Sequence, residues 1–460
     1  MAISPTDGAT TGNDTIYGGT GNDEINALAG NDLVLGLAGE DLIYGEDGDD
    51  SLYGGDYNDT IYGGNGNDAI FGDGMVDSLY GDAGNDWIEL GYLFGGSIGM
   101  ADGGAGNDTL RVFDTGDATL IGGTGIDLIE IAWLPLLVAD DVTIDFDAGI
   151  ARSGFGQNVT FSEFERLSVY LSLGDDAVSG SSQDDFLWVD AGANQVDARA
   201  GHDTVRYLIG DANTLEGGAG LDRLIAYSGN TGSSVYFIYD SYEGDVDDGQ
   251  LSLITGFEAF DVIGGEQNDI ISTGGGNDAL YGNGGDDTLA GKVGQDRIYG
   301  GGGNDDINGG ADSDILGGGS GNDTMIGSSG RDQLTGGTGA DQLFGGVEAD
   351  WLNGGWGFDT LTGGGGADVF YHLGVAGHGS DSVMDYNAAE GDVLVYGNAF
   401  ATQGDFRVQF AASPLLGDPA TADAFIVNWR TGQIVWVLAD GSEQENIWLR
   451  VAGQTFDLLD

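Results

Sequence analysis

An unbroken nine-residue spacing of aspartates constrains this chain more than any other feature. Twenty-one aspartates follow it in two runs, from Asp14 to Asp86 and from Asp269 to Asp368. Two residues after each stands an apolar side chain, such as Ile16, and before most of them comes a glycine-rich turn. A short repeat of turn, acid and aliphatic residue is typical of a solenoid, which grows by stacking coils.

The charge balance excludes several classes of partner. The net charge is −65, only one lysine is present, and 90 of the 460 residues are glycine. Self-repulsion and glycine entropy predict an expanded chain when no metal is bound. Nucleic acid and anionic membrane surfaces are not expected partners, because both require a basic face.

Disulfides and a membrane span are also not expected. The chain has no cysteine, and no apolar stretch is long enough to cross a bilayer. The first residues, Met1–Asp7, have neither a basic end nor an apolar stretch, so no cleavable secretory signal is predicted there.

Composition and periodicity divide the chain into five predicted parts. These are an N-terminal tail (1–11), a first regular array (12–90), a degenerate middle region (91–262), a second array (263–370) and a C-terminal capping region (371–460).

Each nine-residue unit predicts a tight glycine turn followed by a three-residue strand whose middle residue points inward. Two units make one coil, so Asp14 should lie above Asp32 and Asp23 above Asp41. Glycine permits positive φ and so lets carbonyl oxygens turn toward the aspartates. Carboxylate and carbonyl oxygens favour calcium over a transition metal. The fold predicted is all-β, a parallel β-roll or β-helix solenoid.

The middle region contains a duplication. The segment 105–112 recurs as 200–207, and alternating runs at 142–146 and 235–239 predict strands of ordinary length. We interpret this region as a degenerate continuation of the solenoid with paired strands inserted twice. The single Pro135 indicates a loop or an edge.

Later turns of the second array are less regular. Asp312 and Glu348 replace a glycine, and Arg331 and Phe358 precede their aspartates. Weaker or missing metal sites are expected at those turns. After them, two strand patterns joined by 430–432 predict a hairpin that covers the end of the array.

The predicted metal ligands are the aspartates of the two arrays. They are Asp14, Asp23, Asp32, Asp41, Asp50, Asp59, Asp68, Asp86, Asp278, Asp287, Asp296, Asp305, Asp314, Asp323, Asp332, Asp341, Asp350 and Asp359. The alternative, a merely solvated acidic face, does not account for their register with the glycine turns.

Signals for catalysis are weak, and no enzymatic activity is expected. His202 is predicted to be a turn residue, and His372 and His378 to be surface residues. Residues 95–99 fit Gly-x-Ser-x-Gly but lack the strand and helix that this motif needs. Carboxylate pairs such as those at 140–141 and 247–248 carry no signal among 77 acids.

Aromatic residues recur three positions after the array aspartates and are predicted to point outward as ladders. One set is Tyr17, Tyr53 and Phe71, with Leu35 at the intervening position, and the other is Tyr44, Tyr62 and Tyr80. Tyrosine suits an exposed strand position in any case. The functional alternative is an exposed aromatic surface that serves in self-association or stacks on sugars.

The unit Gly-Gly-x-Gly-x-Asp-x-apolar-x, as in 63–71, resembles the RTX (repeats-in-toxin) nonapeptide of secreted bacterial proteins. This resemblance covers both arrays. Segments 366–370, 379–386, 391–394 and 456–460 resemble the family's C-terminal secretion region. The resemblance implies a parallel β-roll, multiple bound Ca²⁺ ions, and export from a Gram-negative bacterium by the type I secretion machinery.

Three functions remain open at this point. The first is a secreted structural or adhesive protein at the cell surface or in extracellular matrix, with self-association or the binding of surface glycans as its means of attachment. The second is a polysaccharide-binding or polysaccharide-modifying protein with its site in residues 91–262. The third is a calcium buffer or sensor. In each case calcium binding should supply the folding free energy outside the cell, at sites with Kd of roughly 10⁻⁴ to 10⁻³ M.

Overall fold

The computed structural model describes residues 9–91, 98–113, 117–133, 141–171, 173–229, 234–240, 245–247, 252–375, 378–411 and 421–459. Within these residues the regular structure is β-strand, apart from two 3₁₀ turns, η1 (Gln403–Asp405) and η2 (Gly441–Glu443). The all-β prediction is confirmed. The chain forms two compact units, residues 1–224 with 250–257 and residues 225–249 with 258–460.

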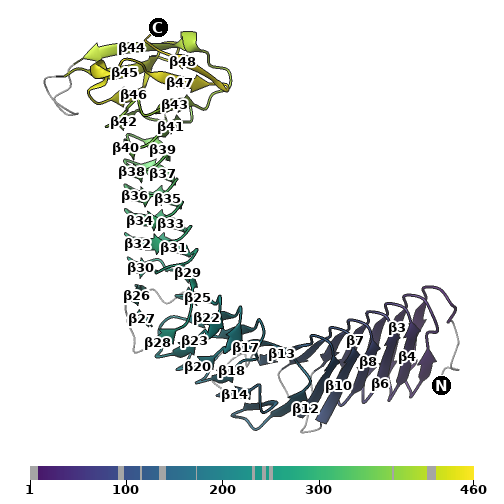
Figure 1. Ribbon diagram of the computed structural model, residues 1–460. Coiled ribbons are helices and arrows are strands. Elements are labelled where there is room, and N and C mark those ends of the chain that lie inside the picture. The colour runs from purple at the N-terminus through teal and green to yellow at the C-terminus, as the bar shows by residue number, and fades with distance from the viewer. Residues whose placement is uncertain are drawn as a thin grey trace. The chain divides into compact units, whose positions relative to one another are not determined.

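The first unit is a solenoid in which each coil contributes one strand to each of two parallel stacks (Figure 1). One stack contains β1 (Thr15–Tyr17), β3 (Leu33–Ala38), β5 (Ser51–Asp56), β7 (Ala69–Asp73), β9 (Trp87–Leu90), β11 (Thr109–Phe113), β13 (Leu128–Trp133), β17 (Arg166–Leu171), β19 (Phe186–Val189) and β22 (Thr204–Leu208). The other contains β2 (Glu24–Asn26), β4 (Leu42–Asp47), β6 (Thr60–Asn65), β8 (Ser78–Ala83), β10 (Ile98–Ala105), β12 (Asp117–Thr124), β18 (Ala177–Ser179), β20 (Gln195–Asp197), β23 (Thr214–Glu216) and β28 (Leu253–Thr255). A small separate pair is formed by β21 (Ala200–Gly201) and β24 (Ala219–Gly220).

The register between coils in the array is eighteen residues, as the two-unit coil requires. Val34 pairs with Leu52 in one stack and Ile43 with Ile61 in the other. These aliphatic side chains are fully buried. Burying each contributes about 1.5–3 kcal/mol, so the interior of the coil is a continuous aliphatic column.

Most array strands are longer than the three residues predicted. β4 and β6 have six residues, with alternating burial in their first four. The second inward position is the first glycine of the next turn, such as Gly45. A residue without a side chain is needed there, because a Cβ atom would overlap the Asp50 carboxylate.

The predicted insertions of paired strands are confirmed in the middle of the chain. In the first unit β14 (Val142–Asp145), β15 (Ile150–Ser153) and β16 (Asn158–Ser162) form an antiparallel addition, and β16 joins the stack beside β12. In the second unit β26 (Tyr236–Asp240) pairs antiparallel with β27 (Asp245–Asp247) and parallel with β30 (Ile270–Ser272). Pro135 lies outside the described residues.

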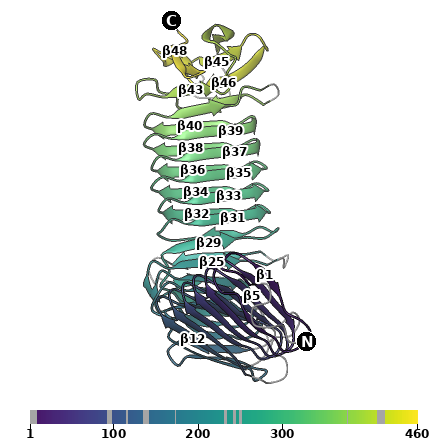
Figure 2. The same cartoon turned by 90° about the vertical axis from the view of Figure 1, so that its right-hand side faces the viewer.

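The second unit repeats the coil with the same register, and Figure 2 shows its rungs stacked in parallel. β25 (Arg223–Tyr227) contains the division between the units. One stack contains β29 (Ala259–Ile263), β31 (Ala279–Gly284), β33 (Arg297–Gly302), β35 (Ile315–Ser320), β37 (Gln333–Gly339), β39 (Trp351–Gly357), β41 (Val369–His372), β43 (Val393–Tyr396), β47 (Trp448–Val451) and β48 (Gln454–Asp457). The other contains β30 (Ile270–Ser272), β32 (Thr288–Val293), β34 (Asp306–Ala311), β36 (Thr324–Ser329), β38 (Gln342–Val347), β40 (Thr360–Gly365), β42 (Asp381–Val383), β44 (Phe406–Ala411), β45 (Asp423–Asn428) and β46 (Gln433–Leu438).

The C-terminal strands cover the end of the second array, as predicted. β43 continues the stack beside β41, and β46 pairs with β42. β45 and β46 form the predicted hairpin.

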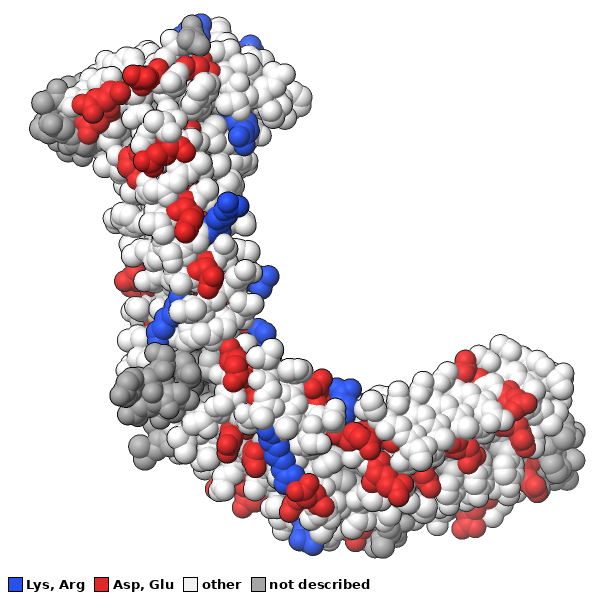
Figure 3. All heavy atoms as spheres, viewed as in Figure 1, with Lys and Arg blue, Asp and Glu red and all other residues white. Residues whose placement is uncertain are grey.

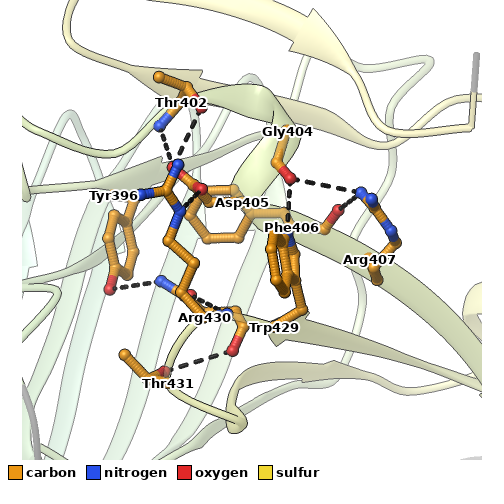
Figure 4. A network of polar contacts seen from close by, with 10 residues as sticks. Tyr396, Thr402, Gly404, Asp405, Phe406, Arg407, Trp429, Arg430 and Thr431 are labelled. Atoms are coloured by element: carbon orange, nitrogen blue, oxygen red, sulfur yellow. Dashed lines mark hydrogen bonds and ion pairs between the residues drawn. The ribbon is translucent and has the colours of Figure 1, made fainter.

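Polar contacts anchor this end (Figure 4). Buried Asp405 forms an ion pair with Arg430, and Trp429 Nε1 donates to the Gly404 carbonyl at 2.6 Å.

Candidate metal centre

The glycine turns place backbone and carboxylate oxygens around one small space in each turn. In the unit 63–68, Gly64 has φ +110° and Gly66 has φ +140°, the left-handed region that glycine adopts without strain. A Cβ atom on Gly63 would overlap Asp68 Oδ2 and would also meet the Gly81 carbonyl oxygen of the next coil. The space beside the first glycine is therefore lined by oxygen from two coils.

The array aspartates form ladders that run from coil to coil. From Asp14 to Asp68 and from Asp269 to Asp350, the backbone N–H of each aspartate donates to Oδ1 of the aspartate eighteen residues further on, at 2.6–2.8 Å in the first array and 2.7–2.9 Å in the second. The stacking of Asp14 on Asp32 and of Asp23 on Asp41 is thus confirmed. Of the eighteen predicted ligands, all except half-buried Asp14 are buried.

The second carboxylate oxygen has no hydrogen-bond partner along most of each ladder. Among the predicted ligands, a buried Oδ2 of this kind belongs to Asp32, Asp41, Asp50, Asp59, Asp68, Asp86, Asp287, Asp296, Asp305, Asp314, Asp323, Asp332, Asp341, Asp350 and Asp359. Asp77 and Asp368, which also lie in the arrays, share this feature. Burying a carboxylate without a compensating charge costs free energy. Binding of a cation at each of these turns would offset that cost.

The first aspartates of the arrays differ from the others. Asp14 Oδ2 accepts from the N–H of Thr10, Asp23 Oδ2 from that of Gly19, and Asp269 Oδ2 from that of Gly265, at 2.5–2.7 Å. Because these carboxylates fold back onto their own turns, their Oδ2 atoms are already occupied. A cation at these turns would have to compete with a backbone donor.

Burial raises the pKa of the ladder carboxyls, and neighbouring aspartates add to the effect. The pKa rises to about 7 at Asp59 and Asp68 and to about 8 at Asp77. In the second array it rises to about 7 at Asp314 and Asp341. In the absence of metal, protons therefore serve as the counter-charge in these turns.

The donor set fits calcium. Every turn offers carboxylate and carbonyl oxygens, which are the hard ligands that Ca²⁺ prefers. The absence of a side chain at the first glycine keeps the space open, and the unpartnered Oδ2 atoms line it. Bound calcium would supply positive charge between stacked coils, and the glycine carbonyls and aspartates of this chain would hold it.

The ladder continues through the middle of the chain, where the nine-residue rhythm is lost. Asp86 donates to Asp108 and Asp108 to Asp127, across 22 and 19 residues, both at 2.8 Å. Asp185 and Asp203 form a further step, at 2.8 Å. Sequence reasoning missed these residues, although the local unit 103–110 carries the full glycine–aspartate pattern.

In the opposite stack of the middle region, asparagines occupy the two ladder positions that follow Asp176. Asp176 N–H donates to Asn194 Oδ1 and Asn194 N–H to Asn213 Oδ1, both at 3.0 Å. The amide keeps the bond between coils but brings no charge. This part of the ladder is held without the carboxylate that a calcium ion needs.

The irregular turns keep the backbone of the regular ones. Asp312 and Glu348 adopt φ +76° and +72° where glycine is usual. The ladder bonds at Asp314 and Asp350 are intact. Weaker calcium binding at these turns stays a prediction, and its physical basis is the left-handed strain of two non-glycine residues.

One prediction about the histidines is wrong. His372 and His378 are buried, at 0% and 2% exposure, because the C-terminal strands close over them. His202 is an exposed turn residue, as predicted, and its Nδ1 accepts from the Leu221 N–H. Residues 95–97, Asp140 and Asp248 lie outside the described residues.

The outward aromatic ladders are confirmed. Tyr62 stacks on Tyr44 and on Tyr80, with ring centroids 5.2 and 4.7 Å apart, and Tyr53 stacks on Phe71 at 4.7 Å. Acidic side chains are distributed over the visible face, and basic ones are few (Figure 3). In the part of the chain that the structure describes, no helix could cross a membrane.

No curated protein matches the sequence. Among solved structures the chain is similar to a hyperactive, Ca²⁺-dependent, β-helical antifreeze protein from an Antarctic bacterium. The two are 14% identical over 99% of this chain and 96% of that chain, with a TM-score of 0.14, which supports no argument about function.

The model of the RTX calcium-binding nonapeptide repeat matches more than half of the residues. The matched segments are 8–43, 44–74, 76–91, 170–205, 209–230, 261–289, 281–316, 317–352 and 344–374. Repeats of this family bind calcium, and their number here implies several ions. The chain belongs to the RTX calcium-binding nonapeptide repeat family.

Proposed function

We propose that this chain is a secreted, non-enzymatic RTX protein that folds on calcium after export and serves a structural or adhesive role at the cell surface or in extracellular matrix. The observation that carries the proposal is the ladder of buried, unpartnered carboxylates, which spans both arrays. Low calcium inside the cell leaves these charges mutually repelled, and calcium outside supplies the folding free energy.

Export fits the type I machinery of a Gram-negative bacterium. The tail segments that resemble the family's secretion region lie in the C-terminal strands, as in β42 and β48. An acidic, glycine-rich chain that stays extended without calcium is suited to threading through a channel.

One feature supports a structural or adhesive role. The stacked ladder Tyr44–Tyr62–Tyr80 presents a flat aromatic face. Exposed aromatic patches are typical of surfaces that bind another protein, so self-association in calcium is part of the proposal.

Light scattering tests this role. The molar mass is measured in chelator and then in millimolar calcium. Growth into large or filamentous species supports a polymer of the surface or matrix. A calcium-loaded chain that stays monomeric at high concentration removes self-assembly from the proposal.

A polysaccharide ligand is the second candidate, and one surface of the middle region favours it. Tyr170 lies 5.6 Å from Phe186 and 5.7 Å from Trp188, between ring centroids, and Arg206 lies over Trp188 at 3.8 Å. Such rings can stack on sugars. The test is retardation of the Trp188→Ala protein in gels containing polysaccharides, with Tyr62→Ala as the matched aromatic control. Loss of retardation in Trp188→Ala alone supports the candidate, and equal behaviour of both variants and wild type contradicts it.

A further inference from the structure

The end of the second array holds a buried group of side chains that the calcium ladder does not explain. His372, His378 and Asp381 each offer a ligand atom, and these atoms lie within 4.8 Å of one another. His372 ends β41, Asp381 begins β42, and His378 lies in the segment between them. All three side chains are buried.

The position of His372 departs from the repeat. In regular coils the second inward residue of a strand is a glycine, such as Gly354 in β39, which leaves room for a carboxylate. Here that inward position is occupied by an imidazole. Asp381 stands beside Asp359 at the start of paired strands, so it takes the next place in the aspartate column. An imidazole thus lies beside this aspartate column at the last turn, where regular turns have no side chain.

The polar atoms of the group are incompletely paired. Asp381 is fully buried, and its carboxyl lies against Asp359, with which it shares hydrogen bonds. His378 Nδ1 is buried without a hydrogen bond. Buried polar atoms in native proteins are nearly always paired. An unpaired, buried imidazole nitrogen in a group whose ligand atoms lie within 4.8 Å of one another indicates that a further group belongs there.

Aromatic walls enclose the group. The His372 ring stacks on Tyr396 at 5.8 Å and meets Trp436 edge-on at 5.6 Å, and the His378 ring lies 5.3 Å from Trp356, all between ring centroids. The two imidazole centroids are 4.4 Å apart. Packing of this kind holds the rings in place and excludes water, which strengthens coordination by nitrogen.

We infer that His372, His378 and Asp381 form a site for one divalent transition metal of the zinc type, separate in chemistry from the calcium turns. Two imidazoles and one carboxylate are a ligand set for Zn²⁺, Ni²⁺ or Fe²⁺ rather than for Ca²⁺. Three protein ligands leave the fourth position of a tetrahedral ion open to a further ligand. Such an ion ties β41 to β42 across the segment that joins the array to its C-terminal strands.

Binding requires one local rearrangement. His372 Nδ1 accepts from the Gly374 N–H at 3.0 Å, and Nε2 lies 3.4 Å from the Gly379 carbonyl. A metal must replace one of these contacts, and the other then orients the ring, as outer contacts do in metal sites. Gly374 has φ +76°. Because a glycine backbone changes conformation at little cost in free energy, its N–H can move away from His372.

The test uses the full chain, saturated with calcium and freed of transition metals. Zinc is titrated against a chromogenic competitor in millimolar calcium. We expect about one equivalent with a Kd below about 1 µM. His378→Gln should weaken this binding at least about 100-fold, whereas His202→Gln, at the exposed histidine of the first unit, should leave it unchanged.

Three results overturn the inference: no such equivalent in the wild-type protein, equal zinc binding by His378→Gln, or displacement of zinc by millimolar calcium. A readout that needs no variant guards against misfolding. The chain has three histidines, so zinc should shift two sets of imidazole NMR signals and leave that of His202 in place. Unshifted signals for His372 and His378 contradict the site.

Discussion

The backbone N–H of Asp41 donates to Oδ1 of Asp59, one coil further along, at 2.7 Å. The same residue that stacks the coils therefore also carries the charge that calcium must neutralise, since Asp59 Oδ2 is buried and unpartnered. Folding and metal binding are therefore coupled through one carboxylate group. Its Oδ1 accepts the hydrogen bond between coils, and its Oδ2 is left for the cation.

Asp305→Asn should separate the two roles. The amide can keep the inter-coil bond, as Asn194 does naturally, but it removes one charged ligand. Calcium affinity should fall about tenfold at that turn and more weakly at the turns of Asp287 and Asp323, which are stacked on it. Isothermal titration measures the change, with exposed Asp306→Asn as the control. An unchanged titration curve for Asp305→Asn removes the inter-coil site model.

Two glycines of one turn should respond differently to alanine. A Cβ on Gly363 would overlap the Asp368 carboxylate, whereas one on Gly365 meets nothing within 4 Å. Gly363→Ala should therefore lower the free energy of unfolding in calcium by more than about 2 kcal/mol, and Gly365→Ala by less than about 0.5 kcal/mol. Thermal or denaturant unfolding compares them. Equal effects would show that the space beside the first glycine is not needed.

Acid should favour the metal-free fold. Burial raises the pKa of Asp59, Asp68 and Asp341 from 3.8 to about 7, so the folded state holds protons that the unfolded chain has released. Stability in chelator is then greatest below about pH 4 and is lost as the pH rises through about 7. Circular dichroism across this range measures it.

Calcium should reverse that trend, because it displaces the same protons, so its apparent affinity should strengthen as the pH rises through about 7. Proton release on calcium binding near pH 6.5 is the companion measurement. Metal-free protein that gains structure as the pH rises would have the opposite sign and contradict the account.

Tyr62→Ala interrupts the outward aromatic ladder between Tyr44 and Tyr80. Loss of two stacked contacts should cost about 1 kcal/mol of stability and should reduce any calcium-dependent self-association. Thr60→Ala, on the same strand and also half-exposed, is the matched control. If light scattering shows that both variants associate like the wild type, the ladder has no adhesive role.

The sequence predicts the arrays well because every element of the unit has a local cause. Glycine permits the turn, aspartate provides the ligand, and the aliphatic residue two positions on fills the coil. The predicted stacking of Asp23 on Asp41 follows from the period alone, and the structure confirms it.

The sequence predicts less where the period changes. Asp108 belongs to the ladder, but it follows Asp86 by 22 residues, whereas regular ladder steps span 18 residues. A rule of constant spacing misses it. Similarly, the burial of His372 depends on strands that come later in the chain, such as β43 and β46. The sequence around His372 does not indicate that these strands will cover it.

The most direct test of the account is the far-UV circular dichroism of the full chain at pH 7.5, first in chelator and then during titration with calcium. The buried ladder predicts a largely unfolded chain in chelator and a cooperative gain of β structure at millimolar calcium. A chain that is fully folded in chelator at this pH, with no change on adding calcium, would contradict the claim that calcium supplies the folding free energy.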